Sequence, residues 1–187
     1  MPLSTFENYY GRVSQAVLGI QRDQITAGIL GIRNTIDSGS RIWVAGNGGS
    51  AATASHFATD LSRCTNSNGA PIKAISLCDN SGLMTAIGND FGFDYIFSRQ
   101  LSNAAIFGDL LVVLTASGNS RNLLVAMDWA KDNEVKVLAL TGFSGGKVKD
   151  LADISIHVPT AIGDYGVAED AHSILCHFLS SQFRTNS

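Results

Sequence analysis

The sequence is poor in charged residues, in proline and in cysteine. Charged side chains make up 16% of the 187 residues, and 13 Lys and Arg against 16 Asp and Glu give a formal net charge of -3. Because no cluster of basic residues could neutralise a run of phosphates, we do not expect nucleic acid as a partner. With only 3 prolines and 45% hydrophobic residues, the composition excludes a disordered or collagen-like chain.

Long apolar runs and targeting signals are also missing. No apolar stretch approaches the roughly 18 residues of a membrane span, and Met1 to Ser4 lack the basic and apolar regions of a signal peptide. We therefore expect a cytoplasmic protein that has no membrane partner. The three cysteines, Cys64, Cys78 and Cys176, form no CxxC pair, which predicts free and mostly buried thiols.

Glycine, in contrast, is abundant, and 19 glycines against 3 prolines indicate many tight backbone turns. An amphipathic stretch from Phe6 to Ile36 predicts one or two helices, opened by a capping box at Ser4 and Glu7. The runs that predict strands are 41–45, 72–77, 110–114, 135–140 and 154–158. Helices are expected between them, notably over 51–61 and 120–132, and a last helix of about 18 residues begins near residue 165.

This alternation predicts an α/β fold with a mostly parallel sheet and helices on both of its faces. No internal repeat, linker or low-complexity segment interrupts the pattern. We therefore expect one domain over residues 1–187, with a helical region at 1–38 and an α/β core at 39–187.

Two glycine-containing turns follow predicted strands. Gly46-Asn47-Gly48-Gly49-Ser50 follows the first strand, and Thr115-Ala116-Ser117-Gly118-Asn119-Ser120 follows the third. Free backbone N–H groups and the positive end of the helix dipole converge at such turns, so each can hold an anion. Each can also be an ordinary connection in which a serine caps the helix. Because the carboxyl ends of parallel strands meet at one edge of a sheet, we expect the two turns to share a ligand.

The first turn also matches a relaxed dinucleotide-binding fingerprint, Gly46-x-Gly48-x-x-Ala51. The acidic residue of that fingerprint should follow about 20 residues later, whereas Asp79 is about 30 residues away. No lysine follows the glycines as in an ATP-binding loop. We therefore predict a phosphate carried by a small molecule and no nucleotide cofactor.

Two predicted helices carry carboxylate and imidazole groups at helical spacing. His56 and Asp60 are four residues apart, and Glu169, Ser173 and His177 repeat this spacing on the last helix. Such pairs can act as general acids and bases or hold a divalent metal, and they can also be solvated surface pairs. Of the two remaining histidines, His157 is expected to be structural, and His172 is expected either to be structural or to support the site residues from behind.

Five segments in this order resemble the sugar isomerase (SIS) domain family, in its phosphoheptose isomerase branch. They are AGNGGSAATASHFATDL (45–61), AIGNDFGFDYIFSRQL (86–101), TASGNSRN (115–122), LTGFSGGK (140–147) and AEDAHSILCH (168–177). The resemblance implies a flavodoxin-like three-layer sandwich around a five-stranded parallel sheet, with an N-terminal helical extension. It also implies a homotetramer with active sites at subunit interfaces.

The reaction implied is the conversion of sedoheptulose 7-phosphate to D-glycero-D-manno-heptose 7-phosphate through an enediol, for the synthesis of nucleotide-activated heptose. By resemblance, Asp60 and His177 are the catalytic pair, and zinc is bound by His56, Asp60, Glu169 and His177. The positions implied for the phosphosugar are Asn47, Gly48, Gly49, Ser50, Asn89, Asp90, Thr115, Ala116, Ser117, Ser120 and Glu169.

The sequence departs from the branch at three of these places. Asp60 replaces a glutamate, Glu169 replaces a glutamine, and Cys64 occupies the position of an arginine, with Arg63 one residue earlier. Two alternatives therefore stay open. One is an isomerase of a different phosphosugar, and the other is a non-catalytic, phosphosugar-binding SIS protein of the kind that binds a replication initiator.

The spacing of Glu169 and His177 constrains how they could share a metal. Eight residues of continuous helix separate them by about 12 Å, which strains joint ligation of one ion. Either Glu169 precedes the regular helix, or the two residues act in different sites formed with neighbouring subunits. We favour the second arrangement.

Overall fold

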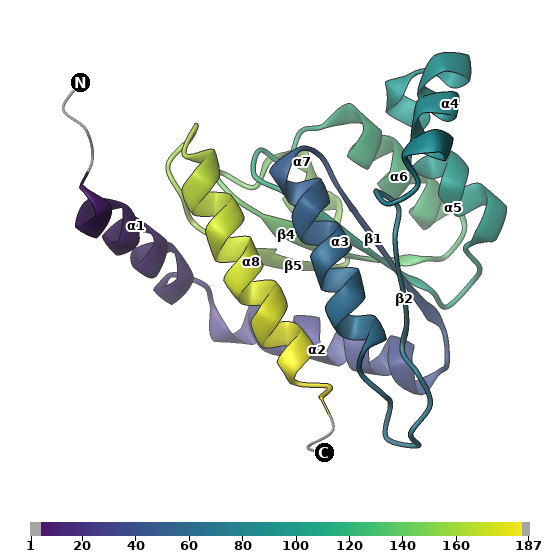
Figure 1. Cartoon of the computed structure of the whole chain (residues 1–187), viewed down its shortest axis with the longest axis horizontal. Helices are drawn as coiled ribbons and strands as arrows, with labels where there is room; N and C mark the ends of the chain where they lie inside the picture. The colour runs from purple at the N-terminus through teal and green to yellow at the C-terminus, as the bar shows by residue number, and fades with distance from the viewer. Residues whose placement is uncertain (1–4, 185–187) are drawn as a thin grey trace.

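The structure is a computed structural model that describes residues 5–184, and its centre is a five-stranded parallel sheet (Figure 1). The strands are β1 (Arg41–Gly46), β2 (Lys73–Ser76), β3 (Leu110–Thr115), β4 (Lys136–Thr141) and β5 (Ile154–His157). Their order in the sheet is β2-β1-β3-β4-β5, and every neighbouring pair is parallel. The five predicted strands and their parallel arrangement are confirmed.

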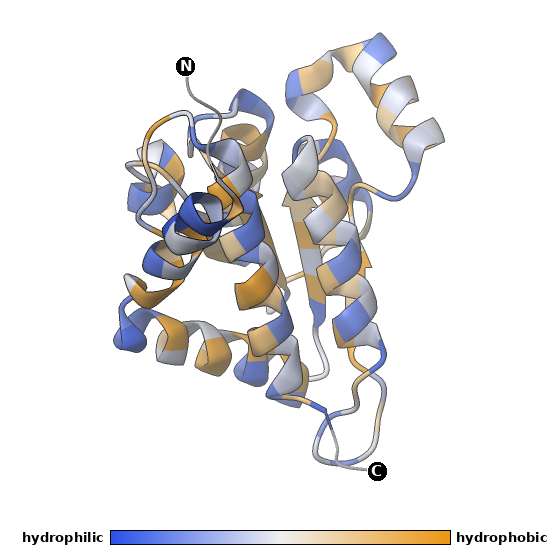
Figure 2. Ribbon diagram, turned by 60° about the vertical axis from the view of Figure 1, so that its left-hand side comes forward, coloured by the Kyte–Doolittle hydropathy of each residue, from blue (hydrophilic) through white to orange (hydrophobic). Residues whose placement is uncertain are grey.

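Helices cover both faces of the sheet. They are α1 (Phe6–Leu18), α2 (Arg22–Asp37), α3 (Gly49–Ser62), α4 (Ser81–Phe91), the 3-10 turn η1 (Phe93–Tyr95), α5 (Ser98–Ala104), α6 (Arg121–Asp132), α7 (Gly146–Leu151) and α8 (Tyr165–Ser181). One core lies between the sheet and α1, α2, α3 and α8, and the other lies between the sheet and α4 to α7. Figure 2 shows the apolar strands between these two groups of helices, so the predicted three-layer sandwich is confirmed.

Strand residues alternate between the two cores. In β3, Leu110, Val112 and Leu114 belong to the first core, while Leu111 and Val113 belong to the second. All six residues of β3 are buried, because successive side chains point to opposite faces and each face is covered. This explains why the central strands are continuous apolar runs in the sequence.

The N-terminal region forms two helices rather than one. Helix α1 begins after Thr5, whose hydroxyl accepts the N–H of Asn8 at 3.2 Å. The capping box was predicted at Ser4, which lies outside the described residues, and the N-cap of the structure is Thr5. Helix α1 packs on α8, where the hydroxyl of Tyr9 donates to Asp170 at 2.6 Å. Within residues 5–184, no helix combines the length and the hydropathy needed to cross a bilayer.

His172 is buried in α8 with 1% of its surface exposed. Neither of its ring nitrogens has a hydrogen-bond partner among residues 5–184. Burial lowers the pKa of His172 from 6.5 to about 4. The ring is therefore neutral in the folded protein at neutral pH, in agreement with a structural role.

This histidine should make stability depend on pH. The unfolded chain binds a proton near pH 6.5 and the folded chain only near pH 4, so stability is full above pH 6.5 and falls as the pH drops toward 4. The expected loss from His172 approaches about 3 kcal/mol at most. Urea unfolding at pH 7 and pH 5 measures it, and His172→Asn should flatten the profile. If the free energy of unfolding of His172→Asn falls as much between pH 7 and pH 5 as that of the wild-type protein, His172 is not the cause of the pH dependence.

Candidate active site on helices α3 and α8

The β1–α3 turn leaves the sheet at Gly46 and enters helix α3 at Gly49. The N-cap of the helix is Gly48, whose φ of +57° lies in the region that favours glycine, and no side chain caps this end. Ser50 follows in the first turn and is 4% exposed. The turn therefore presents backbone N–H groups at the positive end of a 14-residue helix.

The β3–α6 turn is built mainly from hydroxyl-bearing residues. The Thr115 hydroxyl accepts the N–H of Gly118 at 3.1 Å, and Ser120 is the N-cap of α6. Gly118 has a φ of +67°, and a Cβ atom there would overlap the backbone of Gly145. Ala116 is buried, while Ser117 is partly exposed. The turn is thus held tightly by its own backbone and by the loop that precedes α7.

A pair of amide side chains joins the two turns. Asn47 donates to Asn122 and accepts from it, with both hydrogen bonds at 2.9 Å. Asn122 lies in the first turn of α6 and is 1% exposed. The sequence analysis missed Asn122, although an asparagine among the apolar residues at the start of a predicted helix was an available signal. The pair fixes the distance between the two turns.

Removing this pair should loosen the two turns relative to each other. Asn122→Ala removes a buried side chain and leaves the partly buried amide of Asn47 without its partner, so we expect the free energy of unfolding to fall by about 1–3 kcal/mol. A double-mutant cycle with Asn47→Ala measures the coupling between the two side chains. If the loss of unfolding free energy in the double variant equals the sum of the losses in the two single variants, the two side chains are not coupled and the hydrogen-bonded pair does not stabilise the fold.

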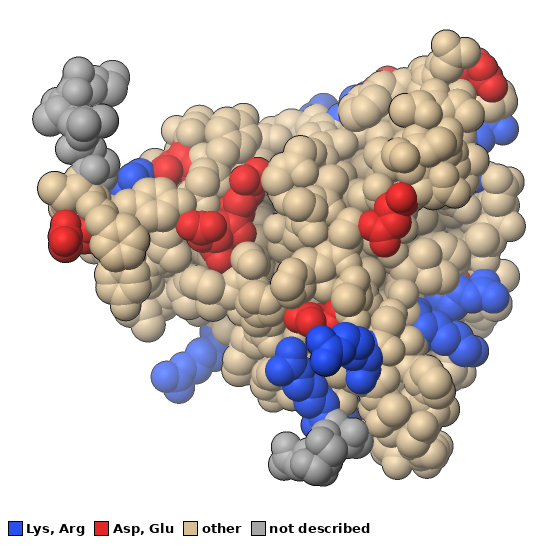
Figure 3. Space-filling model, in the orientation of Figure 1, with Lys and Arg blue, Asp and Glu red and all other residues tan. Residues whose placement is uncertain are grey.

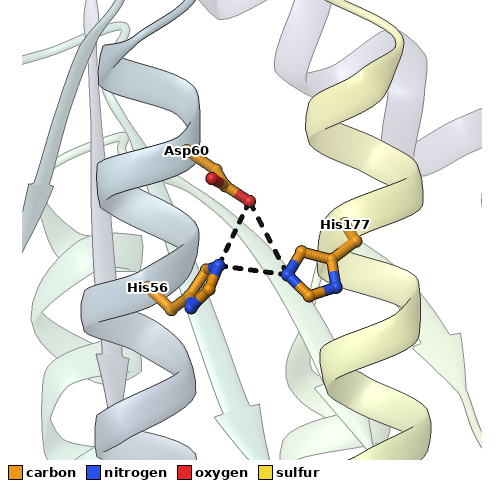
Figure 4. Close-up of side chains that lie close together, drawn as sticks. All are labelled: His56, Asp60 and His177. Carbon is orange, nitrogen blue, oxygen red and sulfur yellow. Dashed lines mark hydrogen bonds and ion pairs between the residues drawn. The ribbon is translucent and has the colours of Figure 1, made fainter.

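Helices α3 and α8 bring three ionisable side chains together (Figure 4). Asp60 Oδ2 lies 3.4 Å from Nε2 of His56 and 3.9 Å from Nε2 of His177, and the two Nε2 atoms are 3.0 Å apart. One ligand atom from each side chain falls within 4.8 Å of the others. Two imidazoles and one carboxylate that converge in this way match the donor set of a catalytic zinc site with an open position.

The burial of these three side chains differs. Asp60 is 8% exposed, and the hydroxyl of Ser180 donates to its Oδ2 at 3.5 Å. The side chains of His56 and His177 are 58% and 52% exposed. The face of the molecule that carries α3 and α8 is mostly uncharged, and basic side chains gather around an acidic patch in its lower part (Figure 3). The carboxylate is therefore held in place while the imidazole edges stay accessible.

Arg184 is a further member of this cluster that the sequence analysis missed. It follows α8, and its Nη2 lies 4.0 Å from Asp60 Oδ1, so Asp60 faces imidazoles on one oxygen and a guanidinium on the other. Cys64 is buried, and its thiol donates to the backbone oxygen of Asp60 at 3.2 Å. Arg63 is exposed at the end of α3. The cation beside Asp60 thus comes from the end of α8.

Glu169 lies apart from the three-residue cluster. It is in the second turn of α8, so the alternative in which it precedes the regular helix is wrong. Its carboxylate rests against Gly49, where a Cβ atom would overlap it. Within one chain, the structure thus places Glu169 at the β1–α3 turn and His177 beside His56.

Asn89 and Asp90 also lie away from the cluster. Both are exposed on α4, and Asn89 donates to Asp90 at 2.9 Å. Helix α4 packs mainly on η1 and stands at the upper right of the molecule (Figure 1). Of the other predicted site residues, those of the two turns lie together at the carboxyl edge of the sheet, because β1 and β3 are neighbours.

Comparisons with known proteins agree with this arrangement. The model of the SIS domain family matches residues 5–142. A phosphoheptose isomerase from Campylobacter concisus (strain 13826) is 40% identical over 148 residues, which are 79% of this chain and 77% of that protein. One from Rhodospirillum rubrum is 44% identical over 126 residues, or 67% of each chain.

A solved structure shows the same likeness in three dimensions. The phosphoheptose isomerase from Neisseria gonorrhoeae superposes with a TM-score of 0.84 at 30% sequence identity, over 95% of this chain and 94% of that one. Family model, sequence relatives and structure thus agree over most of the chain. The chain belongs to the SIS domain family and, within it, to the phosphoheptose isomerase branch.

Proposed function

We propose that the protein is an aldose-ketose isomerase that converts sedoheptulose 7-phosphate to D-glycero-D-manno-heptose 7-phosphate through an enediol. The observation that carries this proposal is the convergence of Asp60 and His177, which come from two helices and lie 3.9 Å apart. Isomerisation moves a proton between adjacent carbons, so it needs a base near them and a group that stabilises the developing oxyanion. The phosphoheptose isomerases among the relatives support the seven-carbon substrate.

In this proposal the substrate phosphate binds at the hydroxyl-bearing turns, and the sugar extends along α3 toward the cluster. Asp60, held by Ser180 and Arg184, takes the proton from the carbon next to the carbonyl group. His177 lies on the accessible side and exchanges a proton with the carbonyl oxygen. Asn89 and Asp90 would contact the polyol of the substrate only from another copy of the chain or after a movement of α4.

We propose zinc as the metal of this site, held by His56, Asp60 and His177, because their ligand atoms already converge. Zinc bound there would polarise the carbonyl group of the sugar in place of the proton from His177, which would then be a ligand of the ion. Glu169 would reach such an ion only in a site shared between subunits, since within its own chain it lies against Gly49.

We further propose a homotetramer with active sites at its subunit interfaces, in the cytoplasm. Half-exposed histidines and the exposed apolar residues Ile174 and Phe178 on α8, each 46% exposed, support an interface at this face. We also propose that residues 1–38 and 39–187 form one folding unit, because Val13 of α1 and Ile32 of α2 are part of the first core.

The function is tested by incubating the purified protein with sedoheptulose 7-phosphate and following aldose formation by NMR. The expected result is turnover that falls after chelation and returns when zinc is added. Tight phosphosugar binding without turnover would instead support a regulatory SIS protein. Turnover of a different ketose phosphate in preference to the seven-carbon one would overturn the proposed substrate.

A further inference from the structure

Tyr165 is the first residue of α8, and 56% of its surface is exposed. It precedes Glu169 by four residues and His177 by eight, so the three side chains lie along one side of the helix. Helices α3 and α8 pack side by side, and Glu169 lies against Gly49 while His177 contacts His56 (Figure 1). Tyr165 therefore lies on the side of α8 that faces α3, one helical turn before the level of Gly49.

The ring of Tyr165 is supported by a second aromatic ring. It packs edge to face on Phe143, with the two ring centroids 5.0 Å apart. Phe143 lies in the loop between β4 and α7, and its φ of +48° is in the left-handed region that a bulky side chain seldom adopts. Its N–H donates to the hydroxyl of Thr160 at 2.9 Å. Strained residues of this kind cluster at binding sites, where the surrounding structure imposes their conformation.

Phe143 also connects Tyr165 to the β3–α6 turn. It forms a small buried cluster with Ala116 of that turn and Ala168 of α8. The N–H of Gly142, the preceding residue, donates to the backbone oxygen of Thr115 at 3.1 Å. The exposed ring at the start of α8 is therefore held beside the turn where the proposed substrate carries its phosphate.

We infer that Tyr165 is a specificity-determining residue whose ring packs against the carbon chain of the substrate, next to the phosphate. The inference rests on the proposed function, because it takes the path of the sugar along α3 from there. A sugar presents C–H groups as well as hydroxyls, and an aromatic ring offers those C–H groups an apolar contact. The ligand class that this ring favours is a phosphorylated sugar over a bare phosphate ion.

The test compares the wild-type protein with Tyr165→Ala in the isomerisation of sedoheptulose 7-phosphate, with inorganic phosphate as a competitive inhibitor. Loss of the ring should raise KM about three- to tenfold. It should leave kcat unchanged, because the ring contacts carbons that do not react and so binds substrate and transition state equally. The inhibition constant of inorganic phosphate should also stay the same, because this ion has no carbon chain.

Two results of this comparison would overturn the inference. One is an unchanged KM in Tyr165→Ala. The other is an equal rise in KM and in the inhibition constant of inorganic phosphate, because Tyr165 would then act only by supporting the β3–α6 turn.

Tyr165→Phe separates the ring from its hydroxyl group. This variant keeps the ring, so its KM should equal that of the wild-type protein. A rise as large as in Tyr165→Ala would assign the contact to the hydroxyl and overturn the role of the ring. Tyr10→Ala is the matched control, because it removes a tyrosine of α1 that is 64% exposed and should change none of the three constants.

Failure of this inference and failure of the proposed function give different results. If the wild-type protein isomerises the sugar and Tyr165→Ala has the same KM, the role of Tyr165 is wrong and the function stands. If the wild-type protein binds sedoheptulose 7-phosphate without isomerising it, titration calorimetry replaces the kinetics. Weaker binding of the sugar phosphate by Tyr165→Ala, with equal binding of inorganic phosphate, would then support the ring contact while the function is wrong.

Discussion

Asp60→Asn should lower kcat for the isomerisation by about 10²- to 10⁴-fold, the range for loss of a general acid or base. Asparagine keeps the volume of a side chain that is 8% exposed, but it can no longer accept the proton. It also removes the negative charge that faces His56, His177 and Arg184. Steady-state kinetics with excess zinc measure the effect and prevent a weakened metal affinity from limiting the rate.

Asp128→Asn serves as the control for this variant. Asp128 is exposed on α6, in the helical layer on the opposite face of the sheet, so its kcat should match that of the wild-type protein. Full activity of Asp60→Asn, with an unchanged melting temperature, would show that the proton is moved by another group.

Gly118→Ala should lower the free energy of unfolding by about 3 kcal/mol or more. The φ of Gly118 is +67°, and its new Cβ would overlap the backbone of Gly145, which cannot rotate away as a side chain can. The backbone oxygen of Gly118 also accepts the N–H of Val148, so the loop before α7 must shift with it. Thermal and urea unfolding measure the loss.

Gly11→Ala is the comparison that separates this clash from a general effect of alanine. Gly11 lies inside α1 with no atom within 4 Å of a Cβ built there. Alanine favours a helix interior by about 0.5–1 kcal/mol over glycine, so this variant should be more stable than the wild-type protein. Equal losses in the two variants would contradict the close approach of Gly118 to Gly145.

The layers of the fold could be predicted because their signals are local. Each strand is a short apolar run, and the glycine turns after β1 and β3 mark where α3 and α6 begin. Helix α8 was expected from about residue 165 and spans Tyr165–Ser181. The predicted burial of the cysteines is confirmed for Cys64 and Cys176, whereas Cys78 is partly buried.

Helices α4 and α5 lie where the sequence predicted helices, between the second and third strands, but their bounds could not be predicted in the same way. The apolar residues Leu83, Met84, Ile87 and Phe91 of α4 have helical spacing, but only Ile87 is buried, so this helix lacks the broad core-facing stripe of α8. Its N-cap, Asn80, accepts the N–H of Leu83 at 2.9 Å and was the one local signal of its start.

The candidate site required the fold in addition to the spacing. Four-residue spacing brings His56 to Asp60, but the contact with His177 depends on how α3 and α8 pack, and the sequence analysis inferred it from resemblance. Arg184 reaches Asp60 from beyond the end of α8, where no periodic pattern applies. Glu169, Ser173 and His177 follow one another at four-residue intervals. This spacing could not show that Glu169 lies against Gly49, at the start of α3, while His177 contacts His56 further along the helix.

The hydrogen-bonded pair of Asn47 and Asn122 also affects how fast Asn47 is deamidated while the purified protein is stored. Asn47 precedes Gly48, and asparagine before glycine is prone to spontaneous deamidation, in which the next backbone nitrogen attacks the side-chain carbonyl. In the folded protein both ends of the Asn47 amide are bonded to Asn122, so this attack must await release of the side chain. The aspartate formed would have no side-chain N–H to donate to Asn122. Stored protein would therefore lose the hydrogen-bonded pair between the two turns and keep its hydrophobic cores.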